Sequence, residues 1–154
     1  MKNAILLLLV TSCFFISCGH HYKEGDGYIT VYNNADVSLT IQAISDARFD
    51  ISRETSFDYS ATNLPLTIEK GAHQKITFSY RIDTSQGYSP TAKLSVAIDC
   101  LYETTSGIQR PQFGTKEGDS VKIDTYNGNW ITDGEVLDFV KTTDGKYVLA
   151  RVSQ

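Results

Sequence analysis

The chain has 154 residues, a formal net charge of −4 and an aromatic content of 11%. This length is enough for one ordinary domain with its own core, and the aromatic content excludes a disordered chain. Lys and Arg form no run anywhere in the sequence. We therefore expect no nucleic-acid partner, because binding to a phosphate backbone needs a basic patch.

The chain begins with a segment, residues 1–17, that is typical of an export signal. Lys2 supplies a positive charge, and Ala4–Val10 is an unbroken apolar run that Phe14-Phe15-Ile16 extends. A charged start, a short apolar stretch and a small residue before a polar region are the features of a cleaved signal peptide. A transmembrane anchor is the alternative, but the run is shorter than the roughly 20 residues that a spanning helix needs.

The end of this signal, Ile16-Ser17-Cys18, resembles the lipobox of bacterial lipoproteins, with Phe15 where that family usually has Leu. The resemblance implies cleavage before Cys18 and lipid on that residue. We therefore expect a protein tethered by lipid in the bacterial cell envelope, at the outer membrane or cell surface rather than the inner membrane. Stable tethering takes two or more acyl chains, and lipidated cysteines of this family carry that many.

Cys13 is the alternative lipid site, because Val10-Thr11-Ser12-Cys13 is also an acceptable lipobox. We prefer Cys18, since cleavage before Cys13 would leave Phe14-Phe15-Ile16 at the head of the mature chain. If Cys13 carried the lipid instead, Cys18 and Cys100 could form a disulfide.

Residues 18–27 are predicted to form a short tether, and from Tyr28 onward the sequence has period 2. Apolar and polar residues alternate in the stretches Tyr28–Tyr32, Val37–Ala43, Lys75–Ile82, Thr91–Cys100, Val121–Asp124 and Lys146–Val152. This alternation predicts half-buried strands of an antiparallel sheet, and many short strands separated by turns predict a β-sandwich or barrel. Cys100 lies on the apolar face of its stretch, so we expect a core cysteine rather than a reactive thiol.

The segment Asp133–Thr143 allows two interpretations. Val136, Leu137, Phe139 and Val140 fit one face of a helix with Asp133 as its N-cap, but the same residues also fit a strand. We favour the strand.

The order of the predicted strands resembles that of the immunoglobulin-like domains of the major sperm protein / ASPM-SPD-2-Hydin group. The resemblance rests on Val31-Tyr32-Asn33-Asn34, Leu66-Thr67-Ile68-Glu69-Lys70-Gly71 and the alternating strand Ile76–Tyr80, and it covers about residues 29–99. It implies an all-β, immunoglobulin-like antiparallel β-sandwich over residues 28–100. The chain departs from the pattern at Lys70-Gly71, where the group has Pro-Gly. Residues 101–154 have no counterpart, and we expect them to form a β extension packed on the same domain.

Candidate catalytic and metal-binding residues are few. The histidines are His20, His21 and His73, and His73 opens a predicted strand as an exposed edge residue. Adjacent imidazoles at His20-His21 could capture copper or zinc weakly, but a polar tether accounts for them better. The sequence contains no nucleophile motif and no glycine-rich phosphate loop. We predict no enzyme activity, no catalytic or metal site and no cofactor.

One polar and aromatic cluster suggests an interaction surface. Its side chains are Tyr126, Asn127, Asn129 and Trp130, in the sequence Tyr-Asn-Gly-Asn-Trp. Trp130 and the asparagines could stack on and hydrogen-bond to a sugar, or anchor a protein interface. The competing interpretation is an Asn-Gly hairpin whose Trp130 covers the edge of the core. Further tyrosines lie near strand ends and turns, where they could form an adhesive surface or be ordinary sheet-edge residues: Tyr22, Tyr28, Tyr32, Tyr59, Tyr88 and Tyr102.

These features predict a membrane-anchored envelope lipoprotein without enzyme activity, whose β-sandwich binds an envelope protein or acts as a scaffold. Open sandwich edges could accept a strand from that partner. A cell-surface carbohydrate-binding module centred on Trp130, with a glycan as its ligand, is the alternative.

Overall fold

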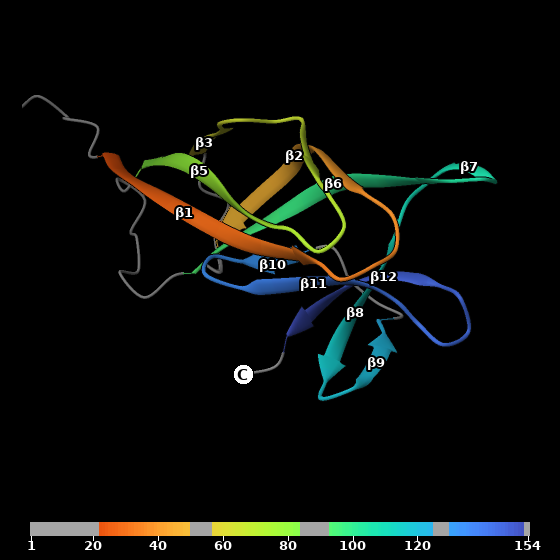
Figure 1. Cartoon of the computed structure of the whole chain (residues 1–154). Helices are drawn as coiled ribbons and strands as arrows, with labels where there is room; N and C mark the ends of the chain where they lie inside the picture. Colours follow the sequence, from red (N-terminus) through yellow and green to blue (C-terminus); the bar gives the residue numbers. More distant parts are fainter. Residues whose placement is uncertain (1–21, 50–56, 84–92, 125–129, 153–154) are drawn as a thin grey trace, which may run out of the picture.

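The computed structural model describes residues 22–49, 57–83, 93–124 and 130–152. These residues form twelve β-strands and no helix, and the strands build two sheets that pack against each other (Figure 1). The prediction of an all-β sandwich is therefore confirmed.

The larger sheet has the strand order β3-β5-β1-β11-β12-β8-β9. In that order its strands are Phe57–Ala61, His73–Asp83, Tyr22–Asn33, Val136–Lys141, Tyr147–Val152, Gln112–Glu117 and Ser120–Ile123. The smaller sheet has the order β10-β6-β2-β4, with β7 also paired to β6. Its strands are Trp130–Thr132 (β10), Leu94–Thr104 (β6), Leu39–Phe49 (β2), Leu66–Ile68 (β4) and Gly107–Gln109 (β7).

Strands that follow one another in the sequence often lie in different sheets. β1 pairs with β5 in one sheet, while β2 pairs with β6 and β6 with β10 in the other. From β1 to β6 the chain changes sheet at every step, so that β1, β3 and β5 lie in the larger sheet and β2, β4 and β6 in the smaller one.

The C-terminal strands are built into both sheets. β11 lies beside β1 in parallel, with Thr30 opposite Val136 and Asn33 opposite Phe139. β12 is antiparallel to β11, β8 is parallel to β12, and β10 extends the smaller sheet. The strand interpretation of Asp133–Thr143 is confirmed, because this segment contains β11. Asp133 caps no helix there; its Oδ1 instead accepts a hydrogen bond of 2.8 Å from the backbone N–H of Tyr28.

The predicted tether is too long, because β1 begins at Tyr22 and not near Tyr28. The ladder with β5 runs without interruption from Tyr22 opposite Asp83 to Tyr32 opposite His73. Glycines at 25 and 27 hide this part of the strand from a search for alternating apolar residues. The apolar groups on that face come instead from β5, where Tyr80 lies opposite Gly25 and Phe78 opposite Gly27.

The core lies between the two sheets. Phe78 and Val96 are 1% and 0% exposed, and Cys100 is a buried free cysteine, as the alternation predicted. Further core side chains are Ile29, Val31, Leu39, Ile41, Ile68, Ile76, Ile131, Leu137, Phe139 and Leu149.

The outer face of the larger sheet is divided into a covered half and an open half. Val148 and Ala150 of β12 point away from the core, yet both are fully buried. On this outer side of β12, a cavity is lined by Val121 and Ile123 of β9 and by Val140 of β11. The β8–β9 hairpin therefore covers the β11–β12 half. The outer side chains of β1 and β5 remain exposed, and this open half carries the candidate site.

Candidate functional site

Three tyrosines stand on the open outer face of β1. Tyr22, Tyr28 and Tyr32 are 48%, 41% and 42% exposed. Successive side chains of a strand alternate between its faces, so even spacings place all three on one side. We call these tyrosines, with the basic residues Arg81, Lys75 and His73 beside them on β5, the tyrosine face.

Each tyrosine ring of this face has a basic side chain against it. The Arg81 guanidinium carbon lies 3.9 Å from the centre of the Tyr22 ring, and Lys75 Nζ lies 3.7 Å from that of Tyr28. The His73 ring stacks on Tyr32 at 5.0 Å, with 24° between the ring planes. Cation–π contacts of this kind are worth about 0.5–1 kcal/mol at exposed sites. The face therefore presents aromatic and cationic groups in paired positions.

Two acidic side chains balance the charge of this face. Glu24 Oε1 lies 3.6 Å from Arg81 Nε, and Asp26 Oδ1 accepts a hydrogen bond of 2.7 Å from Ser79 Oγ. Glu24 thus lies beside Arg81, and the two carboxylates equal in number the two permanent cations of the face, Arg81 and Lys75. The face is polar and aromatic with little net charge.

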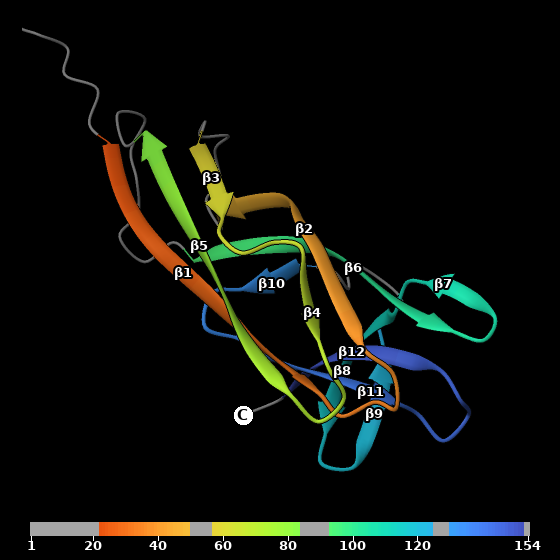
Figure 2. The ribbon, with the colours of Figure 1, turned by 45° about the horizontal axis from the view of Figure 1, so that its top comes forward.

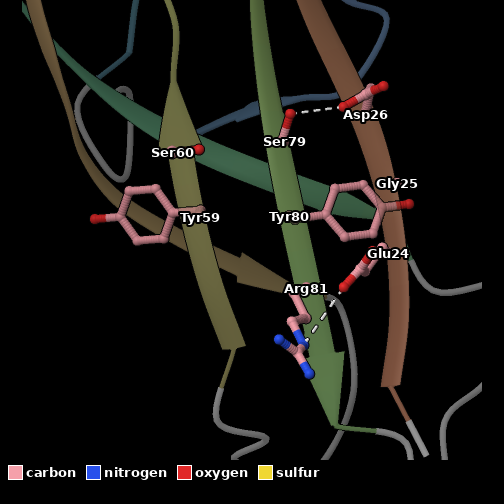
Figure 3. A pocket seen from close by; sticks show the side chains of 8 residues that line it. All are labelled: Glu24, Gly25, Asp26, Tyr59, Ser60, Ser79, Tyr80 and Arg81. Carbon is pink, nitrogen blue, oxygen red and sulfur yellow. Dashed lines mark hydrogen bonds and ion pairs between the residues drawn. The ribbon is translucent and has the colours of Figure 1, made fainter.

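The strands of this face end in a cavity of about 530 Å³. In the view of Figure 2 the start of β1 and the end of β5 extend past the smaller sheet, with β3 beside them. The cavity at this end, which we call the end cavity, is lined by Glu24, Gly25, Asp26, Tyr59, Ser60, Ser79, Tyr80 and Arg81 (Figure 3).

Gly25 lets the ring of Tyr80 lie against β1 on the core-facing side of the larger sheet, whereas Glu24 and Asp26 point to its outer side. A Cβ added to Gly25 would lie 2.5 Å from Tyr80 Oη and 2.6 Å from Tyr80 Cζ. Only the absence of a side chain allows the ring to take this position. Tyr59 stands opposite Tyr80 on the other side, so Gly25, Tyr80 and Tyr59 form one cross-strand row.

The predicted interaction surface is described only at Trp130; Tyr126, Asn127 and Asn129 lie outside the described residues. Trp130 is half-buried at the start of β10, opposite Ala97 of β6, which is 3% exposed. The Trp130 carbonyl accepts a hydrogen bond of 2.5 Å from Arg151 Nη2. Arg151 also contacts Asp124 and Glu135, so this corner ties the edges of both sheets together.

A second cavity, of about 580 Å³, lies beside the β6–β7 and β11–β12 hairpins. Its three basic side chains all have acidic partners: Arg110 pairs with Asp99, Lys141 with Asp36 and Lys146 with Asp144. Hydrogen bonds from Tyr147 and from Lys141 lower the pKa of Asp36 to about 2. These ion pairs neutralise the positive charges of Arg110, Lys141 and Lys146, so the cavity does not attract an anion.

The remaining candidate residues carry no visible chemistry in the described part of the chain. Burial, and to a lesser degree the nearby charge of Asp99, raises the pKa of the Cys100 thiol to about 12, so it stays protonated at neutral pH. Within the described ranges no three His, Cys, Asp or Glu side chains are grouped as a metal site, and no helix is long and apolar enough to span a membrane. Cys18, Cys13, His20 and His21 lie outside these ranges.

The sequence contains two further indications of this site, which a search for alternating apolar residues does not detect. The spacings of Tyr22, Tyr28 and Tyr32 are even, but they place the rings on one face only if the strand reaches Tyr22. The Gly-x-Gly at 25 and 27, matched by Phe-x-Tyr at 78 and 80, becomes informative only when the register of β1 and β5 is known.

Comparison of the chain with models of protein families, with curated proteins and with solved structures finds no match.

Proposed function

We propose that this protein is a non-enzymatic, lipid-anchored binding protein of the bacterial cell envelope, and that its tyrosine face contacts an envelope protein. The observation that carries the proposal is the set of three exposed tyrosines, each beside a basic side chain, on one face. Tyr and Arg are the residues enriched at protein interfaces and at their energetic hot spots.

The size of the face predicts a weak contact. Tyr32 lies ten positions after Tyr22, which is about 33 Å of strand. Its two strands, β5 and β1, make it about 10 Å wide, so its area is about 330 Å². Stable interfaces bury about 800 Å² on each partner. We therefore expect a transient, micromolar contact, to which a shared membrane would add effective concentration.

The sheet edges favour a contact through the face rather than by addition of a strand. As described, the edge strands β3, β9, β10 and β4 have five, four, three and three residues. Short edges offer few unpaired backbone groups to a partner strand.

The proposed anchor is the lipid on Cys18. β1 begins only four residues later, at Tyr22, and four extended residues span at most about 14 Å. An anchored chain would therefore hold the start of β1 close to the membrane surface. The test is growth with radioactive palmitate: Cys18→Ala should lose both label and membrane association, while Cys13→Ala should keep both. Label that persists in Cys18→Ala but is lost in Cys13→Ala would show that the lipid site is Cys13.

The partner contact is tested by a photo-cross-linking amino acid at Tyr28 in living cells. We expect one discrete cross-linked protein, recovered also from position Tyr32. The matched control is position Ile108, which is 69% exposed on β7 of the other sheet. Tyr28→Ala should weaken recovery of the cross-linked protein by about tenfold without a change in melting temperature, whereas Ile108→Ala should not weaken it. Equal cross-linking from Ile108 would refute the assignment of the face.

A further inference from the structure

We infer that the tyrosine face binds a second copy of this chain, face to face, about a twofold axis that passes by Tyr28. The inference rests on the proposed function, since it names the envelope protein that the face contacts. Each outward residue of β1 lies opposite one residue of β5, and we call such a pair a row. In a closed twofold dimer both copies use the same surface, so the rows of one copy must suit the rows of the other.

The Tyr22 end of the face has an excess of negative charge. Glu24 shares a row with Arg81, and Asp26 shares a row with Ser79 (Figure 3). Among the described side chains at this end, two carboxylates and one guanidinium give a net charge of about −1 at neutral pH. Asp26 accepts its hydrogen bond from a neutral hydroxyl, so its charge remains available to a partner.

The Tyr32 end of the face has an excess of positive charge. Lys75 supplies this charge, and its ammonium lies against the Tyr28 ring. No ion pair within the described part of the chain involves Lys75. The carboxylate beside this end, Asp138, is 4% exposed and already pairs with Lys116. The charge of Lys75 is therefore also available to a partner.

A twofold axis perpendicular to the strands at the row of Tyr28 brings these opposite charges together. The row of Asp26 and the row that holds Lys75 lie two residues to either side of the axis, so each meets the other in the second copy. The rows of Glu24 and His73 lie four residues to either side and meet in the same way, and the imidazole can donate a hydrogen bond to the carboxylate. Face-to-face sheets pack about 10 Å apart, a gap that facing Lys and Asp side chains bridge.

The β8–β9 hairpin, which rises on the same side of the sheet, leaves room for this arrangement. The hairpin covers Val140, which follows the residue paired with Asn33, so it lies past the Tyr32 end of the face. The twofold axis places the two hairpins at opposite ends of the dimer. β11 begins opposite Thr30, so the second copy's hairpin lies beside rows that β11 does not reach.

The area of the face makes the dimer dependent on the membrane. About 330 Å² on each copy is well below the roughly 800 Å² of a stable interface. The lipid proposed on Cys18 would hold both copies at one membrane and raise their effective concentration. We expect the dimer in membranes and its dissociation on dilution in detergent.

The test is photo-cross-linking from Tyr28 in cells that express the full chain with two different epitope tags. We expect an adduct that carries both tags. Asp26→Lys, when present in both copies, should reduce this adduct by about tenfold, because like charges then face each other. Lys75→Asp in both copies should do the same. Both positions are exposed, so the melting temperature should not change.

The decisive measurement combines the two variants in one dimer. Asp26→Lys in one copy and Lys75→Asp in the other should restore the adduct, because both central contacts again join opposite charges. Glu103→Lys makes the same change of charge at an exposed position of the smaller sheet, and it should leave the adduct unchanged.

The possible failures separate this inference from the proposed function. An adduct from Tyr28 with a different protein would overturn the inference and leave the proposed envelope contact intact. No adduct from Tyr28 with any protein would refute that contact and the dimer together. A two-tag adduct that the mixed charge reversals do not restore would show that the copies do not meet about this axis.

Discussion

Gly27 and Phe78 form a contact whose energy can be measured by a double-mutant cycle. Phe78 is 1% exposed, and its ring lies on Gly27, where an added Cβ would be 2.3 Å from Phe78 Cε2. Phe78→Ala removes a buried ring and should cost about 3–5 kcal/mol of unfolding free energy. Gly27→Ala forces the ring aside and should cost about 1–3 kcal/mol by overpacking.

The two costs should not add. In the double variant the methyl group added at position 27 occupies space that the ring has left, so the combined cost should fall below the sum by about 1–3 kcal/mol. The same Cβ would also lie 3.1 Å from Asp133 Oδ1, and this part of the cost should persist without the ring. Urea unfolding of the chain from Gly19 onward, followed by circular dichroism, provides the free energies. Phe78→Leu keeps the cycle measurable if Phe78→Ala is too unstable, since such domains have only about 5–15 kcal/mol. Additivity within about 0.5 kcal/mol would show that ring and glycine do not constrain each other.

Three other predictions concern titration and polar packing. Cys100, with a pKa of about 12, should resist iodoacetamide at pH 8 until the protein is unfolded; rapid labelling of the native protein would contradict its burial. Asp36 has a pKa lowered from 3.8 to about 2 by Tyr147 and Lys141, so its charge stabilises the fold above about pH 4 and this contribution is lost as the pH falls toward 2. The melting temperature of Asp36→Asn should therefore lie below that of the parent at pH 6 and approach it near pH 2, and a constant difference would refute the assignment. Arg151→Leu leaves two half-buried carboxylates without their cation and should cost about 1.5–3 kcal/mol in urea unfolding, while a neutral effect would mean that water replaces the guanidinium.

Local alternation predicted the strands that carry their own apolar residues. The segments around Phe78, Val96 and Cys100 have period 2, and all three side chains are buried. Alternation failed at the start of β1, where Gly25 and Gly27 have no side chain to alternate. The apolar groups that complete this face belong to another strand, so no window of the β1 sequence contains them.

The candidate sites were harder to predict than the fold. The tyrosines were visible as residues near strand ends, but the pairing of Tyr28 with Lys75 and of Tyr32 with His73 depends on the register of two strands about 45 residues apart in the chain. The contact of Tyr80 with Gly25 depends on the same register. Trp130 was chosen for its residue type, and its position opposite Ala97 is set by how β10 joins β6.

The sequence by itself determined the all-β class, the inward-facing side chains of most strands and the prediction of an exported, lipidated chain. These properties are local, since period 2 assigns each side chain to a face and a signal is a contiguous segment. Tertiary structure decided which strands are neighbours: β1 between β5 and β11, the parallel pairs of β1 with β11 and β8 with β12, and the hairpin that covers one half of the outer face. Neighbours are chosen by packing two sheets around one core, an energy shared by residues far apart in the chain. The tyrosine face exists only because that packing left the outer side of the β1–β5 half uncovered.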